Sequence, residues 1–191
     1  MRLPGLRAAI DKFNPQEIGD ATVFFLTHWH SDHYEGLEAL LESISSSSSS
    51  RLRVFLTETT RQLALAKFPS FINHLTRFDV IEPSVARWIE LEGDSGEPVT
   101  ISVTALPANH CPGSVMYLFQ GATIGTILHT GDFRYCSEMR DLLQKWIPRG
   151  VDLLFLDTSF CDVHTRTMPS KQESQQQVLN LIQVHAPNKE I

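Results

Sequence analysis

The most constraining feature of this sequence is the run THWHSDH at residues 27–33, which closes an apolar stretch typical of a strand. Alternate side chains of a strand point to the same side, so His28 and His30 are expected to face one point. The turn that must follow brings Asp32 and His33 to a second point nearby. Two clusters of imidazole and carboxylate ligands suit a pair of metal ions better than one closed tetrahedral site. The alternative, a run of surface histidines in a loop, would leave four ligand side chains repelling one another or idle.

The pattern H-x-H-x-D-H resembles the complete signature of the metallo-β-lactamase fold superfamily. Two later residues, each just after a predicted strand, match in order the third histidine and the bridging aspartate that this resemblance implies: His110 and Asp132. Alone, either would more often be structural. A carboxylate suits the bridge because its two oxygens can hold metals about 3.5–4 Å apart. The first metal is assigned three imidazoles and a carboxylate, and the second metal shares that carboxylate: His28, His30, His110 and Asp132, then Asp32, His33 and Asp132.

Imidazole-rich ligation favours zinc, as one ion or two, with manganese, magnesium and iron left open. The metals would lower the pKa of a shared water towards about 7 and polarise an ester oxygen. Hydrolysis by a metal-bound hydroxide then needs no protein nucleophile. Three residues beside the predicted ligands are weaker candidates for a role in the site. His129 is expected to point elsewhere on its strand, Arg134 to orient Asp132, meet a phosphate or form a salt bridge, and Cys111 to pack beside His110.

Length and composition indicate an ordinary globular chain. Its 191 residues are enough for one domain with a core, at 42% hydrophobic and 20% charged residues. No apolar stretch approaches the roughly 20 residues that span a bilayer, and the N-terminus lacks the apolar region of a signal peptide. The three widely spaced cysteines indicate reduced thiols of an intracellular protein. The net charge of −6 argues mildly against a nucleic-acid surface, although bound metals would offset local carboxylates.

Hydrophobic periodicity predicts strands with interleaved helices, and therefore an α/β architecture. Strands are expected at residues 22–27, 53–57, 88–91, 99–105, 114–119, 124–130 and 151–156. Helices are expected at residues 37–44, 58–67 and 137–146, and after the capping box SKQE at residues 170–173. Residues 70–86 mix helical and loop signals.

Four segments carry more specific expectations. Residues 99–105 alternate strictly and predict a half-buried strand, whereas residues 151–156 predict a buried one. The serine-rich residues 44–50 predict a disordered insertion, because they offer nothing to pack. Residues 8–13 predict a short extended lead-in. Asp11 is interpreted as a lone surface carboxylate, with an approach to the site as the less favoured alternative.

Four stretches together resemble one branch of the superfamily, the Artemis/Apollo family of DNA-crosslink-repair nucleases. They are FLTHWHSDHYEGL at residues 25–37, LPANHCPGSVM at 106–116, LHTGDFR at 128–134 and LDTSFC at 156–161. The resemblance implies a metal-dependent nuclear phosphodiesterase of crosslink and double-strand-break repair. It would act on DNA 5′ ends and single strands, or on hairpins and overhangs, with repair-complex proteins as further partners and no membrane. Asp157 corresponds to the first acidic β-CASP motif, which orients a downstream histidine or assists protonation.

The resemblance also implies a fold: the metallo-β-lactamase αβ/βα sandwich, here as its N-terminal half, interrupted by an inserted β-CASP domain. Residues 1–157 are assigned to that half and residues 158–191 to the beginning of the β-CASP region. The late histidine of the second metal site and the DNA-gripping β-CASP surface are absent, so an incomplete, inactive fragment is expected. Two alternatives stay open: a small-molecule hydrolase of thioesters or lactams, and a non-catalytic metal-binding fragment. The stretches at 130–134 and 156–158 argue against the hydrolase.

Overall fold

The computed structural model describes residues 1–14, 16–45, 52–161 and 169–185. The chain divides into two compact units, Met1–Asp157 and Thr158–Ile191. The assignment of the second unit to a β-CASP region stays a prediction. None of the helices in the described ranges has the length and apolar character needed to cross a membrane.

The first unit contains two sheets. The first sheet is parallel, in the order β1-β2-β3-β4: β1 (Ala8–Ile10), β2 (Val23–Phe25), β3 (Arg53–Leu56) and β4 (Phe78–Val80). Its connections carry α1 (Ser31–Tyr34), α2 (Leu37–Ser45), α3 (Glu58–Lys67) and the 3₁₀ segment η1 (Pro69–Arg77). Helix α3 begins where its sequence predicts, because the Thr57 side chain caps it by accepting a hydrogen bond from the backbone N–H of Thr60.

The second sheet has the order β5-β6-β7-β8-β9: β5 (Ala86–Glu92), β6 (Pro98–Pro107), β7 (Val115–Gly121), β8 (Gly125–His129) and β9 (Leu153–Phe155). Neighbouring strands are antiparallel except β8 and β9, which are parallel. A parallel pair needs a crossover connection, and α4 (Ser137–Trp146) supplies it. Strands β6, β8 and β9 therefore run in the same direction and end at the same edge.

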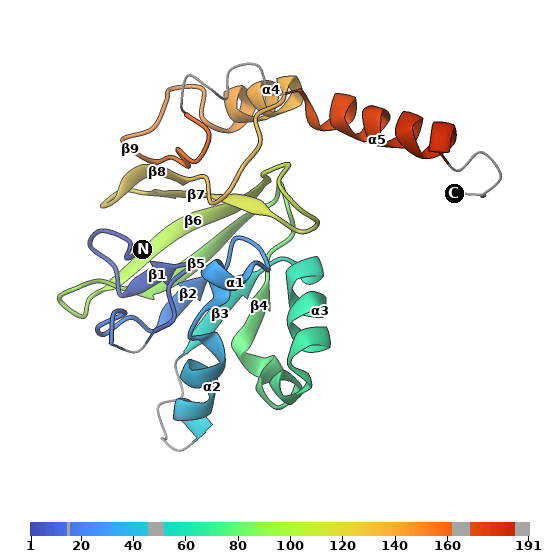
Figure 1. Ribbon diagram of the computed structural model, residues 1–191. Coiled ribbons are helices and arrows are strands. Elements are labelled where there is room, and N and C mark those ends of the chain that lie inside the picture. Colours follow the sequence, from blue (N-terminus) through green and yellow to red (C-terminus); the bar gives the residue numbers. More distant parts are fainter. Residues whose placement is uncertain (15, 46–51, 162–168, 186–191) are drawn as a thin grey trace. The chain divides into compact units, whose positions relative to one another are not determined.

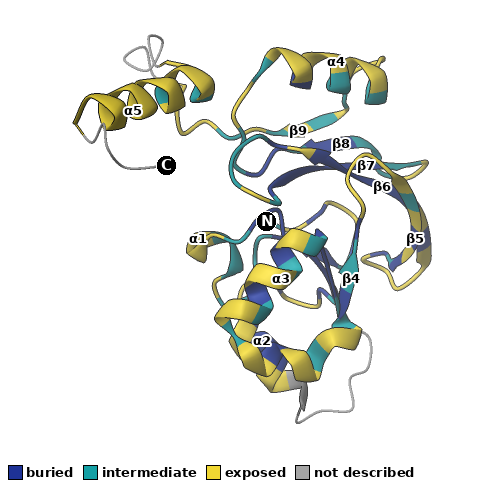
Figure 2. Ribbon diagram, turned by 90° about the vertical axis from the view of Figure 1, so that its right-hand side faces the viewer, coloured by how far each residue is buried: buried dark blue, intermediate teal, exposed yellow. Residues whose placement is uncertain are grey.

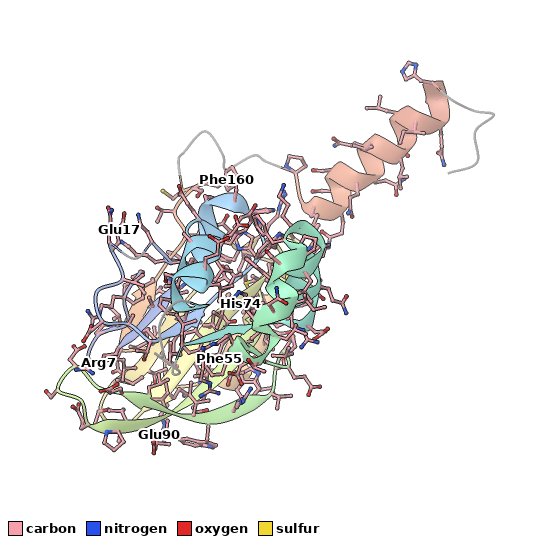
Figure 3. The ribbon with its side chains drawn as sticks, turned by 90° about the horizontal axis from the view of Figure 1, so that it is seen from below. Arg7, Glu17, Phe55, His74, Glu90 and Phe160 are labelled. Atoms are coloured by element: carbon pink, nitrogen blue, oxygen red, sulfur yellow. The ribbon has the colours of Figure 1, made fainter. Side chains whose placement is uncertain are left out.

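The two sheets face each other across the main core, in which Phe25 stacks on Phe55 at 5.1 Å between ring centroids. Figure 3 labels Phe55 among these strands. Helices α2 and α3 lie against the outer face of the first sheet, with their outward sides exposed in Figure 2. Helix α4 packs its apolar residues on the outer face of β6–β8 (Figure 1). The layers are helix, sheet, sheet, helix, which confirms the predicted αβ/βα sandwich.

Two burial predictions are wrong. Strand β6 is buried on both faces from Ile101 to Leu106: the small Ser102 lies between Trp88 and Gln120 of the neighbouring strands, and Leu106 packs in one cluster with Met139 of the later helix α4. Strand β9 is not a buried strand: it pairs only with β8 among the described strands, and Leu154 is 45% exposed. The alternation of polar and apolar residues describes one strand alone. Burial also depends on the strands and helices that pack against it.

The serine-rich stretch also needs correction at its start. Helix α2 extends through residues 44 and 45, which belong to the predicted insertion. Residues 46–50 lie outside the described residues. In the second unit, α5 (Lys171–His185) begins with the predicted capping box. The Glu173 carboxylate accepts from the Ser170 backbone N–H at 2.6 Å, and the Ser170 hydroxyl accepts from the Glu173 N–H at 3.1 Å.

Candidate metal centre

The predicted metal ligands follow the ends of three strands, β2, β6 and β8, and two of them, Asp32 and His33, lie on the short helix α1. β2 leads through residues 27–30 into α1, and the β6–β7 connection carries His110. Asp132 and Asp157 follow β8 and β9. The loops of the two sheets meet where the backbone N–H of Val115 donates to the carbonyl of Thr27 at 3.0 Å. Residues separated by more than a hundred positions are therefore assembled at one end of the sandwich.

Three imidazoles and one carboxylate oxygen converge at the first predicted metal position. His30 Nδ1 lies 3.0 Å from His28 Nε2 and 3.1 Å from His110 Nε2. Asp132 Oδ2 lies 3.8 Å from His28 Nε2 and 3.5 Å from His110 Nε2. Ligands placed about 2.0–2.1 Å from a tetrahedral zinc ion are separated by about 3.3–3.4 Å. The three imidazoles therefore fit one zinc ion with small adjustments, whereas Asp132 lies in a group with His28 and His33, within 4.8 Å of both, and its carboxylate would have to move to complete the set.

The other oxygen of Asp132 faces the second predicted position. Asp132 Oδ1 lies 3.2 Å from His33 Nε2, and Asp32 Oδ2 lies 3.7 Å from the same nitrogen. One carboxylate thus presents one oxygen to each group of donors, as a metal bridge requires. The Asp32 side chain is 78% exposed. The second position has these three donors within the described ranges, one fewer than the first.

Burial keeps two histidines of the first position, His28 and His110, in the form that binds metal. Burial, with the neighbouring His33, lowers the pKa of His28 to about 3. Burial also lowers the pKa of His110. Both imidazoles are therefore neutral at pH 7 and offer a lone pair.

Asp11 lies under the centre and not on the surface, which overturns its interpretation as a lone surface carboxylate. Its side chain is 9% exposed and accepts three hydrogen bonds. The donors are the Thr27 backbone N–H at 2.8 Å, the Thr27 hydroxyl at 2.7 Å and His33 Nδ1 at 2.8 Å. The positive φ of Asp11, 47°, ends β1 and turns the carboxylate toward these donors.

These hydrogen bonds fix which nitrogen of each ring carries the proton. Because the Thr27 hydroxyl donates to Asp11, its oxygen accepts from His28 Nδ1 at 3.0 Å. His33 Nδ1 donates to Asp11 directly. Both rings then turn an unprotonated Nε2 toward Asp132, the arrangement in which a carboxylate orients a metal-binding histidine. In the sequence, the contact between Asp11 and Thr27 had only one signal: an aspartate follows one strand, and Thr27-His28 follows the next.

Comparisons with known proteins show the family of this chain. The family model described as "Beta-lactamase superfamily domain" matches residues 3–186. The chain belongs to the beta-lactamase superfamily. Among curated proteins, Protein artemis of Gallus gallus is 35% identical over 180 residues, covering 91% of this chain and 25% of that protein. The 5′ exonuclease Apollo of Gallus gallus is 39% identical over 188 residues, covering 96% and 35%.

The resemblance to Artemis and Apollo predicted from four short stretches is thereby confirmed. The chain spans about a quarter to a third of the length of these relatives. A solved metallo-β-lactamase with a HARLDQ motif, from Cronobacter sakazakii, aligns with all of this chain and 88% of its own at 15% identity and a TM-score of 0.47.

In this member of the superfamily, the loop after β8 is fixed by contacts with residues at the ends of β8, β2 and β9. His129 Nδ1 accepts from the backbone N–H of Gly131 at 3.0 Å, which supports a structural role for His129. A Cβ on Gly131 would lie 2.9 Å from Thr27, so this glycine lets the Asp132 loop reach the Thr27 loop. Asp157 approaches the same turn, with its Oδ2 3.5 Å from the backbone N–H of Phe133.

The loop that carries His110 is closed by hydroxyl groups. Ser114 Oγ accepts from the backbone N–H groups of His110, at 3.2 Å, and Cys111, at 3.1 Å. Thr57 donates its hydroxyl to the carbonyl of Gly113 at 3.0 Å, which ties the loop to the first turn of α3. The backbone of Arg134 donates to Ala108 at 2.9 Å, and so joins the loops after β6 and β8.

The metal-free protein is expected to lose stability as the pH falls from about 6.5 toward 3. The lowered pKa of His28 means that the unfolded chain binds a proton in this window that the folded chain refuses. Burial disfavours protonated His33, but the Asp11 hydrogen bond outweighs it and raises the pKa. Its contribution is therefore present below pH 6.5 and opposes the loss. Urea midpoints measured with chelator should fall with pH less steeply in His28→Asn. An equal fall in both proteins would contradict the role given to burial.

Proposed function

We propose that this chain forms the metal-binding half of a DNA phosphodiesterase of the nucleus, a 5′ exonuclease or structure-specific endonuclease acting in crosslink and double-strand-break repair. The observation that carries the proposal is the position of Asp132, whose Oδ2 lies 3.5–3.8 Å from His28 and His110 and whose Oδ1 lies 3.2 Å from His33. Paired metals clamp the attacking and leaving oxygens of phosphate esters. The choice of DNA rests on similarity to proteins named 5′ exonuclease Apollo and Protein artemis.

The residues of this chain would act by binding the metal ions and by orienting the imidazoles that hold them. A bound pair of divalent ions, zinc by preference, would supply an activated water and a Lewis acid. His28, His30 and His110 would hold one ion, and Asp132 would supply a carboxylate oxygen to each position. Asp11 keeps the imidazole protons away from both positions through the contacts given above.

Asp157 is proposed to donate a proton beside the first metal position. It lies close enough for its negative charge to oppose the lowering of the His110 pKa by burial. The Thr130 hydroxyl accepts from the Asp157 backbone N–H at 2.9 Å, which fixes the strand end that presents the carboxylate. In the protonated state this carboxyl group could donate to a leaving oxygen.

The activity is tested with a longer protein that continues past residue 191 through the region present in the relatives. With zinc, it is expected to cleave a 5′-phosphorylated DNA single strand and to leave a chromogenic lactam and a thioester intact. Hydrolysis of the lactam or thioester without cleavage of DNA would overturn the choice of substrate. Loss of DNA cleavage on chelation and its return with zinc would link the activity to the centre.

Residues 1–191 alone are expected to show little or no DNA cleavage in the same assay. The second position has three donors in the described part of the chain, so a reacting phosphate would be poorly positioned. A misplacement of about 1 Å can cost roughly a hundredfold in rate. The net charge of −6 adds no general attraction for the phosphate backbone. Robust cleavage by this chain that Asp132→Asn abolishes would contradict this expectation.

Zinc content is expected to be nearer one than two ions per chain after dialysis of residues 1–191. The first position has four donors and should retain its ion, whereas the second has three. His110→Ala should remove most of the retained zinc. The matched control is His74→Ala, because His74 lies on η1, which precedes β4, whereas the metal ligands follow the ends of β2, β6 and β8. Two tightly held ions, or equal loss in both variants, would contradict the assignment of unequal positions.

A further inference from the structure

Strand β5 has the longest unpaired edge among the described strands. It lies at one end of its sheet and has 7 residues, whereas the other end strands, β1, β4 and β9, have 3 residues each. Figure 2 shows it at the outer boundary of the first unit, and Figure 3 labels its residue Glu90. Trp88, in the middle of the strand, is 71% exposed. An open strand edge that carries a large apolar side chain is a template for pairing with another chain.

Two hydrogen bonds just past β5 show which of its backbone groups face the open edge. The N–H of Gly93 donates toward the β6 side, to the carbonyl of Glu97 at 2.8 Å. The carbonyl of Glu92 accepts from the N–H of Arg7 on the opposite side, at 2.9 Å. Successive residues of a strand turn their backbone groups to opposite sides, and β5 pairs with β6 without a break in register. The outward groups therefore belong to every second residue: Ala86, Trp88 and Glu90.

A second copy of the chain would offer the same outward groups. Two strands related by a two-fold axis are antiparallel, and the residue on the axis sets how many pairs form. With Trp88 on the axis, three residue pairs each exchange two hydrogen bonds: Trp88 with Trp88, and Ala86 with Glu90 in both directions. With Ile89 on the axis, only two pairs form, because Ala86 would then face Glu92, whose carbonyl is already bonded. The pairing centred on Trp88 is therefore the more favourable one.

We propose that the chain forms a two-fold dimer in which two β5 strands pair edge to edge about Trp88. Ile89 and Leu91 point into the core, so Trp88 lies on the outer face of the sheet. In the dimer its indole packs against the indole of the second copy. Ala86 of each copy faces Glu90 of the other, so no like charges lie directly opposite each other. This inference is independent of the metal centre and of the proposed function.

The dimer is expected to be weak and to depend on concentration. A contact limited to two strand edges is smaller than the roughly 1,200–2,000 Å² of stable complexes. Sedimentation equilibrium of residues 1–191, from about 1 µM to about 1 mM, covers weak specific association. A chelator excludes bridging by metal, and a reductant excludes disulfides through the exposed Cys161. We expect the average mass to rise from one chain toward two chains over this range.

Trp88→Lys should leave the chain monomeric throughout the series, because it removes the apolar contact and places two ammonium groups side by side. The matched control is Val184→Lys, since Val184 on α5 is 73% exposed and the change of charge is the same. It should dimerise as the native chain does. Far-ultraviolet circular dichroism and urea midpoints of both variants would show that each one folds.

Two changes of the exposed Ala86 test the pairing itself. Ala86→Lys would face Glu90 of the second copy and should strengthen association, whereas Ala86→Glu would oppose the same carboxylate and should weaken it. Each contact occurs twice in the dimer, so each change should alter the association constant by roughly twofold to thirtyfold. Opposite effects of two charges at one exposed position are not expected from a change in folding stability.

The outcomes separate clearly. Association that Trp88→Lys abolishes, and that the two Ala86 variants shift in opposite directions, supports pairing through β5. A native chain that stays monomeric to about 1 mM overturns the inference. Association that survives Trp88→Lys but is lost in Val184→Lys also overturns it, because α5 would then be the contact. None of these results bears on metal binding, which is measured separately.

Discussion

Asp132→Asn is expected to abolish DNA cleavage by the longer, zinc-loaded protein and to weaken metal binding at both positions. Asp132 is the one residue in the described part of the chain that offers an oxygen to each donor group. An amide keeps the shape but removes the charge and one lone-pair oxygen. The loss of rate should exceed the roughly tenfold to hundredfold cost of removing a residue that only supports a ligand.

Variants of two residues near Asp132 serve as controls for Asp132→Asn. His129 accepts from a loop backbone N–H, and the Arg134 backbone joins two loops. His129→Ala and Arg134→Ala should therefore reduce cleavage far less than Asp132→Asn. Similar cleavage rates for Asp132→Asn and His129→Ala would exclude Asp132 as the bridge.

Asp11→Asn is expected to weaken zinc binding by about tenfold to a hundredfold, although Asp11 is not itself a ligand. The carboxylate accepts from Thr27 and from His33. An asparagine would present an N–H in place of one oxygen. The protons of His28 and His33 could then move to the nitrogens that face Asp132, where they compete with metal. Zinc affinity is measured by competition with a chelating dye.

Asp94→Asn is the matched control, because Asp94 is an exposed carboxylate that pairs with Arg2 and lies in the β5–β6 connection, at the edge of the second sheet opposite the end of β6. It should leave zinc affinity unchanged. Unfolding curves of both metal-free variants would show whether Asp11→Asn acts through metal binding or through stability. Equal zinc affinity of the native chain and Asp11→Asn would show that the hydrogen-bonded chain through Thr27 does not control the ligands.

Local signals predicted the helices well. The bounds of α3 and α4 match the predicted ranges 58–67 and 137–146. The sequence beside α3 marks both of its ends: Thr57 caps its N-terminus, and Pro69 follows its C-terminus. Residues 70–86 gave mixed signals because a 3₁₀ segment and a three-residue strand follow each other there.

The site was predictable only where its residues are neighbours in sequence or match a family pattern. His28, His30 and His33 lie within six positions, so their proximity follows from the chain itself. His110 and Asp132 depended on the order of motifs in the superfamily. The role of Asp11 depends on a hydrogen bond across sixteen residues and two adjacent strands, which no local pattern encodes.

The most direct measurement is anomalous X-ray scattering at the zinc absorption edge from crystals of residues 1–191 grown with zinc. We expect a strong peak about 2.0–2.1 Å from His28 Nε2, His30 Nδ1 and His110 Nε2. A second, weaker peak is expected beside His33 and Asp132, because fewer donors hold it. No peak among the three imidazoles, in crystals whose zinc is bound elsewhere, would contradict a metal centre at the ends of these strands.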